Sequence, residues 1–439
     1  MAGDYFELKA RGTNIRTEVM AGITTFLTMA YIIFVNPDML SKTGMDKAAL
    51  VAVTCLVTAI ATIIAGVFGR APIAMAPGMG LNAFFTYTLV LNNKLEWQTA
   101  LGAVFVSGFL FLLLTLIGLR KKLIEAIPPA IIAAISVGIG LFITFIGLVN
   151  LKVIVHSEAT LVSAGAIHAK TLIGLAGLLF MLFLEMKGIK GSLLIGIVFS
   201  TLLAIAFGYV NRPEKLISFN VDIKPIAFQL DILAVLKWGL FGSIFSLMFM
   251  DMFDSIGTLV ACCHQAKMVD GDGKIRGLDR LLAIDAIATM TGALFGTSTT
   301  TSYIESAAGI EQGGRSGLTS VVTGGLFLLA ILFVPLVGIV PEYATAPALI
   351  MVGLFMMKEV RAIDFANLSE AFPAFIIIVM IALSYSISTG LAFGFISFVL
   401  IKSASGRIRD IKPAMWIIAI LSVAFLAGDK LGDLVKGIQ

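Results

Sequence analysis

The 439-residue chain is 59% hydrophobic and 13% charged, with a formal net charge of +4 and a mean hydropathy of +1.01. Soluble domains carry roughly a quarter charged residues, so a water-soluble fold could not bury this much apolar surface, and a lipid bilayer is the expected solvent. The small, scattered charge excludes a nucleic-acid-binding protein. Three cysteines, without CxxC spacing and without a nearby histidine cluster, support neither a disulfide framework nor a metal site.

Apolar stretches of membrane-spanning length follow one another along the whole chain, which predicts an all-α polytopic membrane protein of about 14 spans. Seven precede a polar connector and seven follow it, and a last apolar segment at 413–428 either spans the membrane or lies at its surface. The predicted spans are 17–40, 48–69, 73–91, 99–119, 127–150, 169–187, 191–210, 234–262, 279–296, 299–313, 317–339, 343–358, 370–387 and 388–403.

The distribution of basic residues predicts the orientation. With a cytoplasmic N-terminus, the inner segments hold 20 lysines and arginines and the outer segments hold 9. Such an excess on the inner side is the rule for multi-pass proteins of the plasma membrane or the bacterial inner membrane, where we expect this chain to reside.

An odd number of spans in each half means that the halves enter the membrane from opposite sides, which is typical of an inverted repeat. The expected organisation is a first repeat at 1–210, an extracytoplasmic connector at 211–233, a second repeat at 234–412 and a C-terminal segment at 413–439. A short echo, Gly140-Leu141-Phe142 against Gly353-Leu354-Phe355, agrees with this division but arises easily by chance.

The third span of each half contains residues that disrupt helices. One is the Pro- and Gly-rich run Ala76–Phe85, and the other is the Thr- and Ser-rich run Gly296–Ser306. Irregular backbone at membrane depth persists only when it is buried in protein or lines a wet cavity, and a matched pair of such segments indicates a transport site. Ordinary kinked helices are the alternative.

Two carboxylates, Asp251 and Asp254, lie three residues apart in the eighth span, on one face of a helix without lysine or arginine. Unpartnered carboxylates in a membrane are functional candidates, and this pair could carry a proton. Helix capping or packing is the alternative for each. Asp285 and Glu311 are weaker candidates.

Glu305 lies in the interrupted tenth span beside Ser302 and Ser306. Its carboxylate could accept the N–H groups of a planar heterocycle while exposed backbone amides serve the ring acceptors. Glu305 could equally cap the half-helix that begins there, and the two roles are compatible.

Asn82 takes the corresponding place in the third span, next to Phe84 and Phe85, which could stack on a ring. A satisfied polar group in a broken helix is an equally good interpretation of Asn82. Thr25 and Phe26 in the first span are weaker candidates for substrate contacts.

ATP-driven transport is excluded because the chain has no G-x-x-x-x-G-K-[ST] run. No nucleophile–base pair, metal cluster or large soluble domain supports a membrane enzyme or receptor.

At these residues the chain resembles the nucleobase–cation symporters, and among them the AzgA-type hypoxanthine/adenine/guanine permeases. The resemblance covers nearly the whole length. It is strongest at Glu18–Phe26, Tyr31–Pro37, Ala76–Phe85, Asp251–Thr258 and Ser302–Ser320.

The resemblance implies a uracil-permease-like inverted repeat with short antiparallel strands in spans three and ten. It implies a core domain of spans 1–4 and 8–11 and a gate domain of spans 5–7 and 12–14. Asp254 and Glu305 take the places of the family's acidic residues in spans eight and ten, and Asp251 and Asn82 match positions of the purine subgroup.

The function expected from the residues and the resemblance together is proton-coupled import of hypoxanthine, guanine or adenine, with Asp251, Asp254 and Glu305 as proton-coupling residues. Whether the coupling ion is H⁺ or Na⁺ stays open, as do the preferred purine and a homodimer; no other cofactor is expected. The alternative is a sulfate or bicarbonate carrier on the same architecture, which the three carboxylates oppose.

Overall fold

The computed structural model describes residues 5–118, 127–213, 215–218, 222–235, 240–269 and 275–436, and side chains only as far as residue 427. Some basic residues that support the predicted orientation lie outside these ranges: Arg120, Lys121, Lys122, Lys237 and Lys274.

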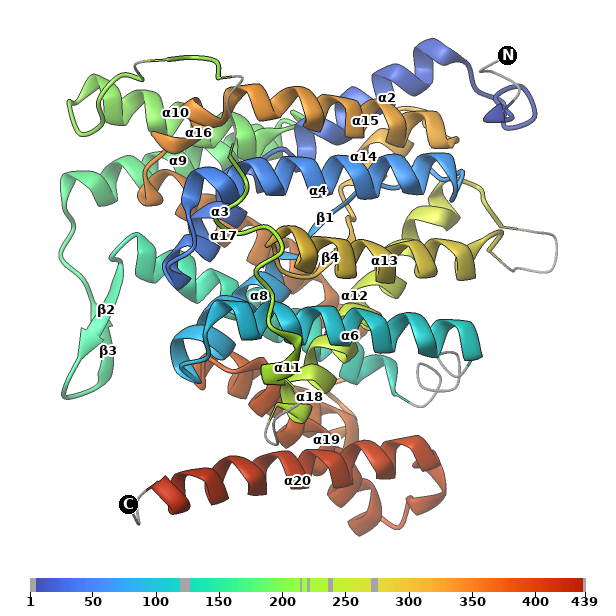
Figure 1. Ribbon diagram of the computed structural model, residues 1–439. Helices are drawn as coiled ribbons and strands as arrows, with labels where there is room; N and C mark the ends of the chain where they lie inside the picture. Colours follow the sequence, from blue (N-terminus) through green and yellow to red (C-terminus); the bar gives the residue numbers. More distant parts are fainter. Residues whose placement is uncertain are drawn as a thin grey trace.

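Within the described residues, nine helical segments are long and apolar enough to cross a bilayer, and three shorter apolar helices accompany them. The chain is therefore a multi-pass helical membrane protein. Long helices lie side by side across the molecule, with α20 at one edge beside α19 (Figure 1).

In the first half, Asn14 and Asp46 begin helices by accepting backbone N–H bonds from Thr17 (2.9 Å) and Ala49 (2.7 Å). The segment predicted as the first span consists of two helices, because the regular helical hydrogen bonding is interrupted at Ala30 and Tyr31. The helices are α2 (Ile15–Met29), α3 (Ile32–Leu40), η1 (Ser41–Thr43), α4 (Lys47–Val67), α6 (Trp97–Ile117), α8 (Pro129–Asn150), α9 (Ala169–Met186) and α10 (Ser192–Ala206).

A hairpin that we did not predict, β2 (Ile154–Ser157) and β3 (Leu161–Ala164), joins α8 to α9. The connector then runs along the molecule to α11 (Ile232–Val235), with Phe228 N donating to Leu294 O (2.7 Å) and Asp231 N to Gln98 O (3.0 Å).

The second half resumes at a long helix and ends with a helix that includes the last predicted apolar segment. Its helices are α12 (Phe241–Gln265), α13 (Leu278–Phe295), α15 (Gly317–Ala330), η3 (Ile331–Phe333), α16 (Val334–Gly338), α17 (Glu342–Met356), η4 (Met357–Ala362), α18 (Leu368–Leu383), α19 (Ile387–Ala404), η5 (Ile408–Asp410) and α20 (Pro413–Lys436).

The two helix-breaking runs fold as a strand followed by a short helix. The first is β1 (Met75–Pro77), α5 (Met79–Ala83) and the π-helix η2 (Phe84–Asn92), and the second is β4 (Thr300–Ser302) with α14 (Ser306–Glu311). β1 and β4 pair antiparallel near the middle of the molecule, as the resemblance implies (Figure 1).

Two groups of helices pack among themselves. In one, α15 packs on α2 and α4, while α13 packs on α4 and α6 and α12 packs on α6. In the other, α8 packs on α17 and α18, and α9 packs on α10 and α17.

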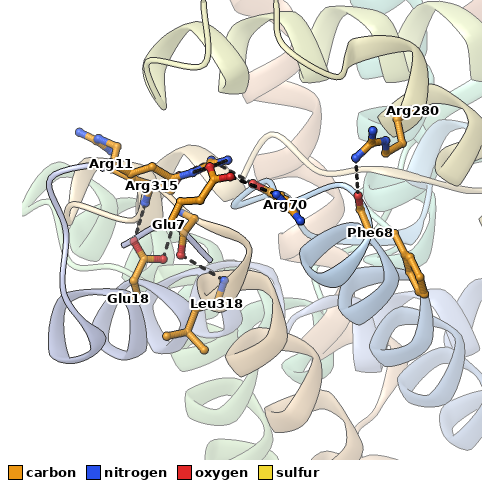
Figure 2. Close-up of polar contacts among 9 residues, drawn as sticks. Glu7, Arg11, Glu18, Phe68, Arg70, Arg280, Arg315 and Leu318 are labelled. Atoms are coloured by element: carbon orange, nitrogen blue, oxygen red, sulfur yellow. Dashed lines mark hydrogen bonds and ion pairs between the residues drawn. The ribbon is translucent and has the colours of Figure 1, made fainter. Parts of the chain in front are cut away.

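Glu18 on α2 is fully buried and forms hydrogen bonds with the residues at the start of α15. Its carboxylate accepts backbone N–H bonds from Arg315 (2.9 Å), Ser316 (3.3 Å) and Thr319 (3.2 Å), and the Thr319 hydroxyl (2.6 Å). Arg11 lies over the same turn, where Figure 2 shows it among Glu7, Arg70 and Arg315. A buried carboxylate that satisfies the first amides of a helix compensates its own desolvation and fixes the helix end.

Candidate functional site

The strand pair supplies the framework of the site. Ala76 lies opposite Thr301, and all six strand residues are buried. At the outer edge of β1, the backbone N–H and C=O of Met75 form hydrogen bonds with the side chain of Thr62 on α4. The Oγ1 of Thr62 lies 3.0 Å from both atoms. The Tyr303 hydroxyl donates to the Pro77 carbonyl (2.5 Å). The non-helical backbone of the strand pair therefore keeps its hydrogen bonds. This is required because unpaired backbone groups are costly where they are buried in protein within a membrane.

Glu305 lies between β4 and α14 and is half-buried. It occupies the N-cap position of α14, but its side chain makes no capping hydrogen bond there. Its Oε1 instead accepts a hydrogen bond of 2.7 Å from the hydroxyl of Tyr31, at the break between α2 and α3. The carboxylate of Glu305 therefore does not cap α14 and is held by Tyr31 instead.

Ser306 and Ser302, the predicted neighbours of Glu305, serve the framework. Ser306 Oγ accepts from Ala74 N (3.0 Å) and donates to Tyr303 O (2.7 Å). Ser302 Oγ donates to Asp285 Oδ1 (2.9 Å). Direct substrate contact by either hydroxyl stays a prediction.

Asp254 is exposed at the middle of α12. It lies close enough to Glu305 and Asp285 for their charges to act on it. Gly257, Ala261 and His264 follow on the same helical face and are exposed as well, whereas most residues from Ser243 to Phe253 are buried. This small and polar face opens from Asp254 toward the C-terminal end of α12.

Asp251 has a different environment from Asp254, although a spacing of three places both on the same side of the helix. It is 1% exposed and accepts a hydrogen bond of 3.0 Å from Thr289 Oγ1, which also donates to Thr300 O (2.9 Å). Asp251 therefore ties α12 to α13 and, through Thr289, to β4, and it does not share the exposed face of Asp254.

Asp285 is more central than its sequence indicates. It is fully buried on α13 and accepts hydrogen bonds from Ser302 on β4 and from Ser255 on α12. Its position inside the predicted span 279–296 was the available signal, because a carboxylate within an apolar span is a functional candidate by itself. Tyr31 carried no comparable signal, since a tyrosine in an apolar span is ordinary.

Asn82 lies in the first turns of α5, fully buried, with its Oδ1 accepting from the Ser298 hydroxyl. Phe84 and Phe85 are fully buried in the apolar core. Their stacking on a substrate ring stays a prediction.

Thr25 and Phe26 lie on α2. Thr25 is 1% exposed, and a Cβ on Gly309 of α14 would stand 2.1 Å from its Oγ1, so the two helices touch there. Phe26 meets the ring of Phe327 edge to face, with centroids 5.0 Å apart.

The site is acidic. Among the described residues, no lysine or arginine forms an ion pair with Asp254 or Glu305, and no group of His, Cys, Asp and Glu could hold a metal ion. Such carboxylates suit proton binding and the recognition of N–H donors, and they disfavour anions.

Known proteins with similar sequences agree with this chemistry. A family described as the Permease family, the xanthine/uracil permeases, matches residues 16–393. A putative permease of Methanocaldococcus jannaschii is 47% identical over 96% of both chains. Adenine permease AdeP of Escherichia coli is 42% identical over 95% of this chain and 94% of its own, and guanine/hypoxanthine permease PbuG of Bacillus subtilis is 38% identical over 96% and 99%.

Two solved structures share the fold. The transmembrane domain of the cyanobacterial bicarbonate transporter BicA superposes with a TM-score of 0.66 at 16% identity, covering 85% of this chain and 97% of that domain. The murine anion transporter Slc26a9 gives 0.64 at 10% identity, covering 89% and 69%. The fold is thus shared with anion carriers. By its sequence, the chain belongs to the nucleobase permease family, whose members are transporters and not enzymes.

Proposed function

We propose that the chain imports purine nucleobases, namely hypoxanthine, guanine or adenine, by proton symport with alternating access. The observation that carries the proposal is a group of two carboxylates that no described basic residue neutralises, Glu305 at the break between β4 and α14 and Asp254 on α12 within range of its charge. Relatives at 38–42% identity that are named adenine and guanine/hypoxanthine permeases support the substrate class.

Both carboxylates bind protons, and one of them also binds the substrate. Glu305, held at Oε1 by Tyr31, accepts the ring and exocyclic N–H groups of the purine when it is ionised. Asp254 lies on the exposed face of α12 and takes up a coupling proton. Asp251, Asp285 and Asn82 hold the strands and α12 in register around them.

An inverted repeat of seven plus seven spans is supported by contacts between corresponding positions. The strands β1 and β4 pair with each other, and Gly140 of α8 meets Gly353 of α17, where a Cβ on Gly353 would stand 2.4 Å from the Gly140 carbonyl oxygen. In a twofold arrangement, equivalent residues meet where the axis passes. The echo around these two glycines therefore belongs to the repeat.

The packing supports a core domain and a gate domain as the moving parts. The helices of spans 1–4 and 8–11 form one of the two groups described above, and α8, α9, α10, α17, α18 and α19 provide spans 5–7 and 12–14. The exposed face of α12 runs from Asp254 to the end that the charge distribution assigns to the cytoplasm, which corresponds to an inward-facing state with a cytoplasmic N-terminus.

Uptake into proteoliposomes is the test. Labelled hypoxanthine should accumulate saturably under an imposed proton gradient, and the uptake should collapse with a protonophore and in Glu305→Ala. Adenine and guanine should compete, whereas sulfate and bicarbonate should not. Accumulation driven by a Na⁺ gradient alone would overturn the proton coupling, and sulfate flux without purine competition would favour the anion carrier.

A further inference from the structure

Tyr31 is the first residue of the stretch Tyr31–Pro37 noted for the family resemblance, but it was not a candidate site residue, and it lies at the break in the first predicted span. It is 2% exposed, and its hydroxyl donates to Glu305 Oε1 over 2.7 Å although the two residues are 274 positions apart. The Oγ1 of Thr28, one helical turn earlier, lies 3.5 Å from the Glu305 carbonyl oxygen. The break between α2 and α3 therefore meets the break between β4 and α14 at Glu305.

A carboxylate has two oxygens, and their surroundings decide what each can bind. Among the described residues, Tyr31 is the one side chain that donates a hydrogen bond to the Glu305 carboxylate, and it engages Oε1. Glu305 is half-buried, whereas Tyr31 is buried. The two oxygens are thus unequal in their side-chain partners: Oε1 has a fixed side-chain donor inside the protein, whereas no described side chain donates to Oε2, and the one further donor to the carboxylate is the residue's own backbone N–H.

We propose that Tyr31 is a positioning residue that makes Oε2 of Glu305 the oxygen that accepts the purine N–H and binds a proton. The inference rests on the role of Glu305 in the proposed function. The proton forms an O–H bond at Oε2 and leaves again as H⁺ from the same atom, and no other bond changes. Protonation at Oε1 would deprive the buried Tyr31 hydroxyl of its acceptor, and burial without a partner is costly.

Tyr31→Phe tests this role because it removes one oxygen atom and keeps the ring in the core. Without the donor, the carboxylate turns more freely and its ionised form loses a charge-assisted hydrogen bond. We expect the KM for hypoxanthine to rise about tenfold with the maximal rate largely retained, and the pH profile of uptake to move toward higher pH.

Tyr343→Phe is the matched control. Its hydroxyl is a buried group on α17 without a hydrogen-bond partner among the described residues, so its removal should leave both KM and the pH profile unchanged. A Tyr31→Phe protein that transports like Tyr343→Phe in both respects overturns the inference.

An infrared measurement separates this inference from the proposed function, since it needs no substrate. pH-difference spectra of the protein in nanodiscs, compared with those of Glu305→Gln, identify the carboxyl bands of Glu305. In Tyr31→Phe the C=O band should move to higher frequency, because the hydrogen bond to that oxygen is lost. An unmoved band refutes the role of Tyr31 even when purine uptake is normal, and a moved band supports it even when no purine is transported.

Incorporation of 3-fluorotyrosine at position 31 guards against a Tyr31→Phe protein that fails to fold. The more acidic phenol donates more strongly, so the same band should move to lower frequency. A shift in the opposite direction, or none, contradicts the proposal.

Discussion

Asp285 holds together the two elements that carry the proposed site. Its carboxylate accepts hydrogen bonds from Ser255 on α12 and Ser302 on β4, and Ser255 also lies 2.8 Å from Thr301 Oγ1. Asp254 lies on α12, and Glu305 follows β4 three residues after Ser302. A fully buried carboxylate in this position sets the distance between the two proposed substrate and proton ligands.

Replacing Asp285 should therefore lower the rate of transport more than it lowers the stability of the fold. Asp285→Asn keeps an acceptor for one serine and loses the second, so we expect uptake to fall about tenfold, the equivalent of one strong hydrogen bond. Asp285→Ala should abolish uptake. Asp279→Asn on the same helix changes an exposed residue in its first turn and should transport normally. Unimpaired uptake in Asp285→Ala would remove the residue from the site.

Sequence reasoning at the residue scale selected Glu305 and Asp254 because an unpaired carboxylate is expensive in a bilayer. The structure places the two near enough for their charges to interact, and their roles stay predictions. The same reasoning treated Asp251 and Asp254 alike and gave Asp285 less weight, whereas the structure gives these three carboxylates different surroundings. Which partner a carboxylate finds depends on neighbours far away in sequence, such as Thr289 and Ser302.

The crossing of α4 and α15 illustrates how helices in this fold come close. A Cβ on Gly317 would stand 1.8 Å from the carbonyl oxygen of Gly66, and a Cβ on Gly66 would stand 2.5 Å from that of Gly317. Small residues that let two backbones touch are the usual means of helix association in lipid, where the hydrophobic effect does not drive it.

Gly317→Ala should force these helices apart. We expect a loss of about 2 kcal/mol in the free energy of unfolding, measured by denaturation in mixed micelles, because the methyl group meets backbone that cannot rotate away. Gly325→Ala in the same helix has open space within 4 Å of its Cβ and should be neutral or slightly stabilising. Equal stabilities of the two variants would contradict the packing argument.

At the element scale, Pro, Gly and clustered Thr identified both broken segments, and the strands lie within them. The sequence did not reveal the β2–β3 hairpin or the break at Tyr31, where no proline or glycine interrupts the helix. Both depend on what the segment packs against.

On the face that the charge distribution assigns to the outside, ionic contacts join the two proposed domains. Lys42, after α3, forms an ion pair with Glu342 of α17 and donates to Asn150 of α8 (2.9 Å). Thr345 of α17 donates to Asp38 of α3 (2.9 Å). Partly exposed pairs contribute little stability, so these contacts suit a closure that forms and breaks during transport.

A bis-methanethiosulfonate cross-link between Lys42→Cys and Glu342→Cys should block uptake, and reduction of the cross-link should restore it, since alternating access requires the two domains to separate there. The control is Glu7→Cys with Arg70→Cys, an ion pair of 3.0 Å within the proposed core domain, whose cross-linking should leave uptake unchanged. Undiminished uptake with the first pair fully cross-linked would rule out this opening.

The sequence by itself determined that the chain resides in a membrane and that the segments around β1 and β4 leave the helical form, because these follow from local composition and the cost of polar groups in a bilayer. It also carried the family resemblance that the comparisons confirmed. Only the tertiary structure decided which carboxylates meet, since Tyr31, Asp254, Asp285 and Glu305 belong to four different segments. Their roles depend on distances of about 3 Å, and sequence spacing does not determine distances between separate helices.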